Sequence, residues 1–149
     1  MIAPLIFYAL LGLLPIAEDL SKTGLLATKQ QAPILLYVSR SDCTFCRRFE
    51  KEQLAPLLNS GLFQNKIIFQ ELVWDAQEPV INFQGNSVSR SRFAQDMKAR
   101  LSPTLLFLDG LGNEIVPRIT GYNSNDYFGY YFEAAIKKAI VKAKSPITG

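Results

Sequence analysis

The chain has 149 residues, enough to bury the core of one domain, and its composition is that of a globular protein, 48% hydrophobic and 19% charged. A net charge of +3, without a stripe of Lys and Arg between aromatic residues, excludes the electrostatic footprint of a nucleic-acid-binding protein. Histidine is absent, which removes catalytic schemes with an imidazole base, and two cysteines are too few for a four-cysteine zinc or iron–sulfur site. We therefore expect no metal and no cofactor.

The N-terminal segment, residues 1–17, carries no charged side chain and contains a nearly unbroken apolar run over residues 5–14. A spanning helix needs about 20 apolar residues, so this shorter run favours a secretory signal peptide cleaved near Ala17. The working domain would then comprise residues 18–149. Because no Lys or Arg precedes the run and a proline lies in the cleavage site, an uncleaved membrane anchor and a buried N-terminal helix remain alternatives.

A short helix is expected over residues 19–30. Leu20, Leu25 and Leu26 would be its apolar contacts, and Gly24 would be its weak point.

The next apolar run, residues 34–38, is continuous and typical of a strand buried on both faces. A helix follows the cysteines, with Pro56 kinking it or ending its first segment and residues 59–61 stopping it. Its apolar positions are Phe49, Leu54, Leu57 and Leu58. The next strand lies within residues 67–74. Strand, helix and strand with short connections predict a βαβ unit with two parallel strands.

The polar stretch over residues 75–91 predicts an excursion or a short hairpin, and a helix is expected over residues 89–100. Residues 105–108 form the next strand, residues 109–113 a tight turn, and residues 115–119 an antiparallel return.

The last helix has the most regular pattern, with apolar residues spaced close to 3.6 per turn. Ser124, Asn125 or Asp126 could cap it. Its apolar positions are Phe128, Tyr131, Phe132, Ala135, Ile136, Ala139 and Ile140. This stripe predicts core packing, and the chain shows no sign of a second domain.

The two cysteines, Cys43 and Cys46, follow the buried strand after a short turn. A thiolate of Cys43 at the start of a helix would face free backbone N–H groups and the positive end of the helix dipole, which lower its pKa. Arg40, Arg47 and Arg48 add positive charge nearby. Cys46 lies one helical turn later on the same face. We therefore expect Cys43 to be an exposed nucleophile and Cys46 a more buried resolving thiol.

The cysteine pair has two other interpretations. An inert disulfide is disfavoured because closing so short a loop restricts the unfolded chain little. A metal site shared between two chains also remains an alternative. The position of the pair at the strand-to-helix junction of a βαβ unit favours redox chemistry over both.

Over roughly residues 34–140 the chain resembles the thioredoxin superfamily, particularly the periplasmic thioredoxin-like proteins of bacteria. Besides the cysteines, the resemblance rests on Ser102-Pro103-Thr104 before the strand at residues 105–108, and on Gly121-Tyr122 after the last strand. It implies a thioredoxin-like α/β fold with a central mixed β-sheet flanked by helices. It also implies a cis bond before Pro103, facing the cysteines, and pairing of the Ser102 backbone with an extended substrate peptide. The alternative is a trans proline that merely opens the strand.

The chain departs from thioredoxins proper at the active-site motif, where Asp42, Thr44 and Phe45 replace residues of Trp-Cys-Gly-Pro-Cys. Thr44 and Phe45 would contact the substrate. Phe45 could form an apolar docking rim or cover the site from water. The buried carboxylate that assists the resolving cysteine in thioredoxins would fall at Tyr37, which cannot act as a carboxylate base.

These features predict an exported, periplasmic and monomeric thiol–disulfide oxidoreductase that acts on protein thiols or disulfides. A membrane or periplasmic redox partner would restore its cysteine pair. The alternatives are a peptide-binding or partner-binding module with little redox turnover, and a dedicated redox partner of one enzyme. The motif leaves open whether the protein reduces, oxidises or isomerises disulfides, because that depends on the reduction potential of the pair.

Overall fold

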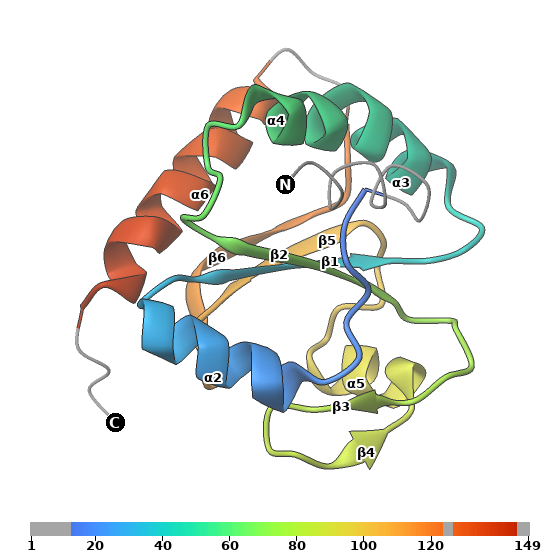
Figure 1. Ribbon diagram of the computed structural model, residues 1–149. Helices are drawn as coiled ribbons and strands as arrows, with labels where there is room; N and C mark the ends of the chain where they lie inside the picture. Colours follow the sequence, from blue (N-terminus) through green and yellow to red (C-terminus); the bar gives the residue numbers. More distant parts are fainter. Residues whose placement is uncertain (1–12, 124–126, 146–149) are drawn as a thin grey trace, which may run out of the picture.

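The computed structural model describes residues 13–123 and 127–145. In this part of the chain, four strands form one sheet in the order β2-β1-β5-β6, with helices on both faces (Figure 1). β1 (Ile34–Ser39) pairs in parallel with β2 (Ile68–Val73) and antiparallel with β5 (Thr104–Leu108). The expected α/β fold with a central mixed sheet is confirmed.

The first half of the sheet is the predicted βαβ unit. Every residue of β1 is buried, as a strand covered on both faces requires. The helical crossover begins as α3 (Thr44–Phe49), widens into a π-helical turn, η1 (Glu50–Leu54), and continues as α4 (Ala55–Ser60). Pro56 lies in the first turn of α4, where the wider turn before it accommodates a residue without an N–H. Gly61 ends the helix with φ of +68°, a conformation that glycine adopts without strain.

The stretch after β2 forms the predicted hairpin, with β3 (Val80–Ile81) antiparallel to β4 (Ser87–Val88). The next helix, α5 (Arg90–Asp96), is capped by Ser89, whose hydroxyl accepts from the Arg92 amide at 3.0 Å. It ends earlier than predicted because the chain reverses at Lys98, which has φ of +54°.

The last strand, β6 (Glu114–Thr120), pairs antiparallel with β5 and leads to the last helix, α6 (Phe128–Ala143). The predicted capping residues, 124–126, lie outside the described residues. The buried positions of α6 are Phe132, Ile136 and Ala139. The prediction that Tyr131 packs in the core is wrong, because the buried stripe of α6 runs through Phe132, Ile136 and Ala139. Tyr131 is 64% exposed and lies edge-on to Tyr130, with ring centroids 5.5 Å apart.

The first described helix, α2 (Leu20–Gln30), contacts the molecule through small side chains. The prediction that Leu25 and Leu26 are apolar contacts of this helix is wrong, since their side chains are 73% and 45% exposed. The buried residues are Leu20, Thr23, Gly24 and Ala27. Gly24 packs against the carbonyl oxygen of Gly110 so closely that a Cβ atom would collide with it. The glycine expected to weaken the helix therefore allows it to approach the β5–β6 turn.

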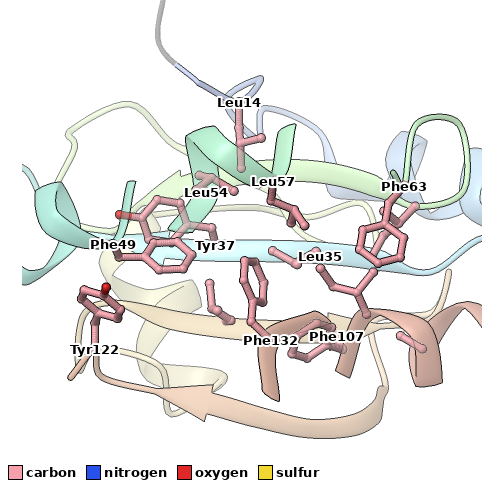
Figure 2. Packing of buried hydrophobic residues seen from close by; sticks show 14 of the residues in the cluster. Leu14, Leu35, Tyr37, Phe49, Leu54, Leu57, Phe63, Phe107, Tyr122 and Phe132 are labelled. Atoms are coloured by element: carbon pink, nitrogen blue, oxygen red, sulfur yellow. The ribbon is translucent and has the colours of Figure 1, made fainter. Parts of the chain in front are cut away.

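The sheet separates two hydrophobic clusters. One contains the cysteines and lies between the sheet, the α3–η1–α4 segment and α6; the other lies on the face covered by α2 and α5 (Figure 1). In the cysteine-side cluster, Phe49 is surrounded by aromatic rings, with Tyr37 at 5.2 Å, Phe132 at 5.5 Å and Tyr122 at 5.9 Å between centroids (Figure 2). This cluster supports the helix that carries both cysteines.

The end of the predicted signal segment packs on the edge of the sheet. Leu14 and Ala17 are 4% and 0% exposed. The Ala17 amide donates to the Glu71 carbonyl at 2.8 Å, and the Glu71 amide donates to the Pro15 carbonyl at 2.9 Å. Residues 14–17 thus contribute backbone pairing and apolar contacts to the domain, while the cleavage site itself stays a prediction. Among the described residues, no helix is long and apolar enough to cross a membrane.

Candidate active site

Cys43 lies at the start of α3, as predicted from its position after the buried strand. It is the N-cap residue, with an extended backbone, φ −142° and ψ 99°. Its Sγ accepts a hydrogen bond from the Cys46 backbone N–H at 3.1 Å. The same N–H would favour the thiolate of a reduced Cys43, because a donor fixed at a helix N-terminus stabilises negative charge there.

Cys43 and Cys46 form a disulfide, with their Cα atoms 5.2 Å apart. Cys43 is 6% exposed and Cys46 is 0% exposed. Cys43 is therefore less accessible than predicted, although it is the more accessible of the two. The reason is the loop before β5: the Ser102 carbonyl oxygen lies 3.7 Å from Cys43 Sγ, and Pro103 is buried beside it.

The loop that contains Ser102 and Pro103 lies against the Cys43 end of the disulfide. The peptide bond between the two residues is cis. The Pro103 carbonyl accepts from the Gly121 amide at 2.7 Å, which ties the loop to the end of β6. Thr104 begins β5, and its hydroxyl donates to the Leu101 carbonyl, closing the loop on itself.

Thr44 and Phe45, between the cysteines, are both exposed. Phe45 has 53% of its surface in solvent, although it is a large apolar side chain next to the disulfide. It does not bury itself over the sulfurs. This exposure favours the docking-rim interpretation over the covering one.

The positive side chains near the cysteines have partners of their own. Arg47 forms an ion pair with Glu50 at 3.2 Å and donates to the Arg40 carbonyl at 3.3 Å. Arg40 in turn donates to the Asp42 carbonyl at 3.1 Å. The Glu50 carboxylate therefore partly neutralises the positive charge of Arg47.

Next to the buried Cys46, Tyr37 and Glu50 form a hydrogen bond. Glu50 was not identified from the sequence as a residue of the site. The Tyr37 hydroxyl donates to Glu50 Oε2 at 2.7 Å and lies 3.4 Å from the Cys46 carbonyl oxygen. Burial, with the adjacent Glu50 carboxylate, raises the pKa of Tyr37 far above its usual value, so the phenol keeps its proton. Glu50 lies four residues after Cys46, a spacing that places both on one helix face and could have identified it.

A second carboxyl group lies on the same face of the sheet. Glu71, in β2, is the register partner of Tyr37 and accepts from the Ser39 hydroxyl. Burial raises the pKa of Glu71, and the nearby Glu50 adds to the effect. A charged residue in the interior of a strand, two positions after the inward-facing Phe69, was the sequence signal for it.

The end of β2 contributes two further residues that the sequence analysis did not select. Trp74 donates from Nε1 to Ser102 Oγ at 2.9 Å. Asp75 accepts from the Ser41 amide at 2.9 Å and from the Ser41 hydroxyl. Because the carboxyl ends of the parallel strands β1 and β2 share one edge of the sheet, residues following β2 were candidates for contact with the cysteine loop.

Within the described ranges, no group of His, Cys, Asp and Glu side chains is arranged to hold a metal ion. The arrangement suits sulfur chemistry instead: a buried cysteine pair at a helix start, a carbonyl oxygen facing the first sulfur, and protonatable groups beneath the second.

The sequence model of the thioredoxin-like domain family matches residues 23–136 of the chain. No curated protein matches the chain in sequence.

Solved structures of thioredoxin type have the same fold. Thioredoxin from Fasciola hepatica has 15% sequence identity and a TM-score of 0.58, covering 85% of this chain and 99% of its own. Thioredoxin NaTrxh from Nicotiana alata has 17% identity and a TM-score of 0.55, covering 85% and 94%. A DsbH oxidoreductase has 15% identity and a TM-score of 0.61, covering 86% and 85%. At these identities the likeness concerns the fold.

Proposed function

Since this chain belongs to the thioredoxin-like family, we propose that it exchanges disulfides with protein substrates through Cys43 and Cys46. The observation that carries the proposal is the position of Cys43 Sγ, which accepts from the Cys46 N–H at 3.1 Å and faces the Ser102 carbonyl at 3.7 Å. One contact stabilises a thiolate, and the other places peptide backbone beside the reacting sulfur.

The proposed reaction runs in two steps. In the reducing direction, the Cys43 thiolate attacks one sulfur of a substrate disulfide, and the other substrate sulfur leaves as a thiolate. Cys46 gives its proton to water and then, as a thiolate, attacks Cys43 Sγ and displaces the substrate sulfur bonded to it; both substrate thiolates take up protons from water. The cysteine pair loses two electrons and becomes the disulfide, while the substrate gains them as two thiols. The reverse sequence oxidises a substrate dithiol.

Substrate binding is assigned to Ser102, Pro103, Thr44 and Phe45. An extended peptide would pair with the Ser102 backbone as an added strand, in the manner of other peptide-binding sheet edges. Support comes from the exposure of Phe45, 53%, which offers an apolar contact beside the sulfurs. Thr44, also exposed, would contact the same peptide.

A second candidate is a binding module that grips extended peptides with little redox turnover. The low exposure of Cys43, 6%, favours it, because a substrate sulfur must reach this atom. The two candidates share the peptide site and differ only in sulfur exchange.

We also propose that the protein is exported, with residues 1–17 as the export signal, and that a membrane or periplasmic partner restores its cysteine pair. Determining the mature N-terminus by mass spectrometry after expression in a bacterium tests the first part. A mature protein that starts at Glu18 would agree with the predicted cleavage. A start before Leu14 would show that the packed residues 14–17 are retained.

Insulin reduction and oxidation of a dithiol peptide test the function, with Cys43→Ser and Cys46→Ala as active-site variants. Cys43→Ser should abolish both activities, and Cys46→Ala should accumulate the mixed disulfide with substrate. Normal turnover by Cys43→Ser would refute sulfur exchange at this site. Peptide binding without turnover by the wild-type protein would establish the binding module. A glutathione redox titration then gives the direction, since a potential near that of thioredoxin indicates a reductant and a much higher one an oxidant.

A further inference from the structure

The backbone at the end of β2 is tied to the end of β1. The Trp74 amide donates to the Ser39 carbonyl at 2.9 Å, just before the chain enters the loop that leads to Cys43. Trp74 therefore lies at the edge of the sheet where the active-site loops begin, with its backbone held by the central strand.

The Trp74 side chain is held from two directions. Its indole Nε1–H donates to Ser102 Oγ at 2.9 Å, and the Arg100 guanidinium lies over the ring, 5.1 Å from its centroid. A cation over an indole face is attracted by the ring electrons. Arg100 and Ser102 both belong to the loop that joins α5 to β5, so the Trp74 ring is held by this loop and the hydroxyl of Ser102 is held against the ring.

The next residue holds the other loop of the site. Asp75 accepts from the backbone N–H of Ser41 at 2.9 Å and from its hydroxyl, two residues before Cys43. The Ser41 hydroxyl is the main reason why the pKa of Asp75 lies below its ordinary value. Adjacent residues at one strand end therefore hold the cysteine loop and the proline loop.

We propose that Trp74 is a positioning residue for peptide substrates, acting through Ser102. The Ser102 carbonyl, 3.7 Å from Cys43 Sγ, belongs to a loop distant in sequence from the cysteines. The inference rests on the proposed function, in which the Ser102 backbone pairs with the substrate. Fixing the side chain of Ser102 on the same strand end that holds the cysteine loop sets the distance between peptide and sulfur. Small errors in such a distance are costly in rate.

The test compares two disulfides in single turnovers of reduced protein. Both release a chromogenic aromatic thiol: one is its mixed disulfide with a short cysteine-containing peptide, the other its mixed disulfide with mercaptoethanol. The Cys43 thiolate attacks the non-aromatic sulfur, the aromatic thiolate leaves and is measured, and Cys46 then displaces the remaining thiol and closes the enzyme disulfide. Only the peptide probe has a backbone that can pair with Ser102.

Trp74→Phe keeps an aromatic ring and removes the indole N–H. It should lower the second-order rate constant for the peptide probe about fivefold to tenfold, the effect of one lost hydrogen bond, and leave that for mercaptoethanol unchanged. Ser102→Ala removes the acceptor of the same hydrogen bond and should lower the rate constant for the peptide probe by a similar factor. The double variant should lose no more than either single one, because all three lack the same contact. Tyr130→Phe, at an exposed ring of α6, is the matched control and should behave as wild type with both probes.

Two results would overturn the inference while leaving the function intact. Equal losses with both probes would mean a general structural effect of Trp74, and an unchanged peptide rate in both Trp74→Phe and Ser102→Ala would mean that the contact is dispensable. Ser102→Ala keeps the indole and so separates loss of the bond from misfolding of the Trp74 variant. A wild-type protein that releases thiol from neither probe would refute the proposed function and this inference with it.

Discussion

Replacing Tyr37 with phenylalanine removes one hydroxyl group beneath the cysteines and keeps the ring. The side chain is 0% exposed and lies edge-on to Phe49, with ring centroids 5.2 Å apart. The ring packing should therefore survive the substitution. What is lost is the hydrogen bond to Glu50 Oε2, 2.7 Å long, and the weaker approach to the Cys46 carbonyl oxygen at 3.4 Å.

The size of the effect follows from the charge and exposure of the acceptor. A hydrogen bond to a charged group contributes about 1.5 to 3 kcal/mol, and the Glu50 side chain is only 18% exposed, so water replaces the phenol poorly. Glu50 keeps its ion pair with Arg47, but that side chain is 53% exposed and the pair contributes less than about 1 kcal/mol. We expect Tyr37→Phe to lower the free energy of unfolding by about 2 kcal/mol.

Urea unfolding of the oxidised protein at neutral pH measures this change as a lower transition midpoint with an unchanged slope. Tyr130→Phe makes the same chemical change at a ring that is 72% exposed, and should shift the free energy by less than about 0.5 kcal/mol. A double-mutant cycle with Glu50→Ala, which removes the acceptor, isolates the contact itself, since the second substitution should cost less once the phenol is gone. If Tyr37→Phe is no more destabilising than Tyr130→Phe, the contact with Glu50 does not stabilise the fold and the reasoning is wrong.

Three further predictions concern the fold and its pH dependence. Gly24→Ala should lower the free energy of unfolding by about 1 to 2 kcal/mol, because the collision with the Gly110 carbonyl outweighs the gain in helix propensity; a midpoint at or above that of wild type would contradict the close packing of α2. A chain that begins at Glu18 should be less stable than one that begins at Leu13 by about 2 kcal/mol or more, since it lacks the buried Leu14; equal urea midpoints would show that residues 14–17 add nothing. Burial raises the pKa of Glu71 above its ordinary value of 4.5, so the folded state binds this proton more tightly than the unfolded chain, and the stability it contributes is lost as the pH rises from that value through the folded-state pKa. Glu71→Gln should flatten this decline in urea titrations across the acid-to-neutral range, and parallel curves for the two proteins would contradict the assignment.

Much of the fold could be predicted from local sequence signals. The apolar run of residues 34–38 became the central strand, and Gly61 ended the helical crossover where a glycine was expected. The place of Cys43 at the start of α3 followed from the strand before it and the helix after it. These features depend on neighbours in the chain, and so they are readable from it.

The errors concern contacts between segments that are distant in sequence. Leu25 and Leu26 are apolar, yet α2 packs through Gly24 because the turn at Gly110 leaves no room for a larger side chain. Cys43 is more buried than expected because a loop from the other half of the chain, at Ser102, lies against its sulfur. The hydrophobicity of a residue indicates whether its burial is favourable. Whether the residue is in fact buried depends on the segment that packs against it.

The positive charge beside the cysteines acts on Cys43 less directly than the sequence suggests. Arg47 forms an ion pair with Glu50 and donates a hydrogen bond to a backbone carbonyl, and Arg40 donates to another carbonyl. The donor in contact with the Cys43 sulfur is the Cys46 backbone N–H at 3.1 Å, which would remain if the surrounding arginines were replaced and which salt screens little because it is buried. We therefore expect the stability of a Cys43 thiolate to depend first on how α3 begins and only second on the charges around it; in the proposed function, that stability would set the balance between reducing and oxidising a substrate.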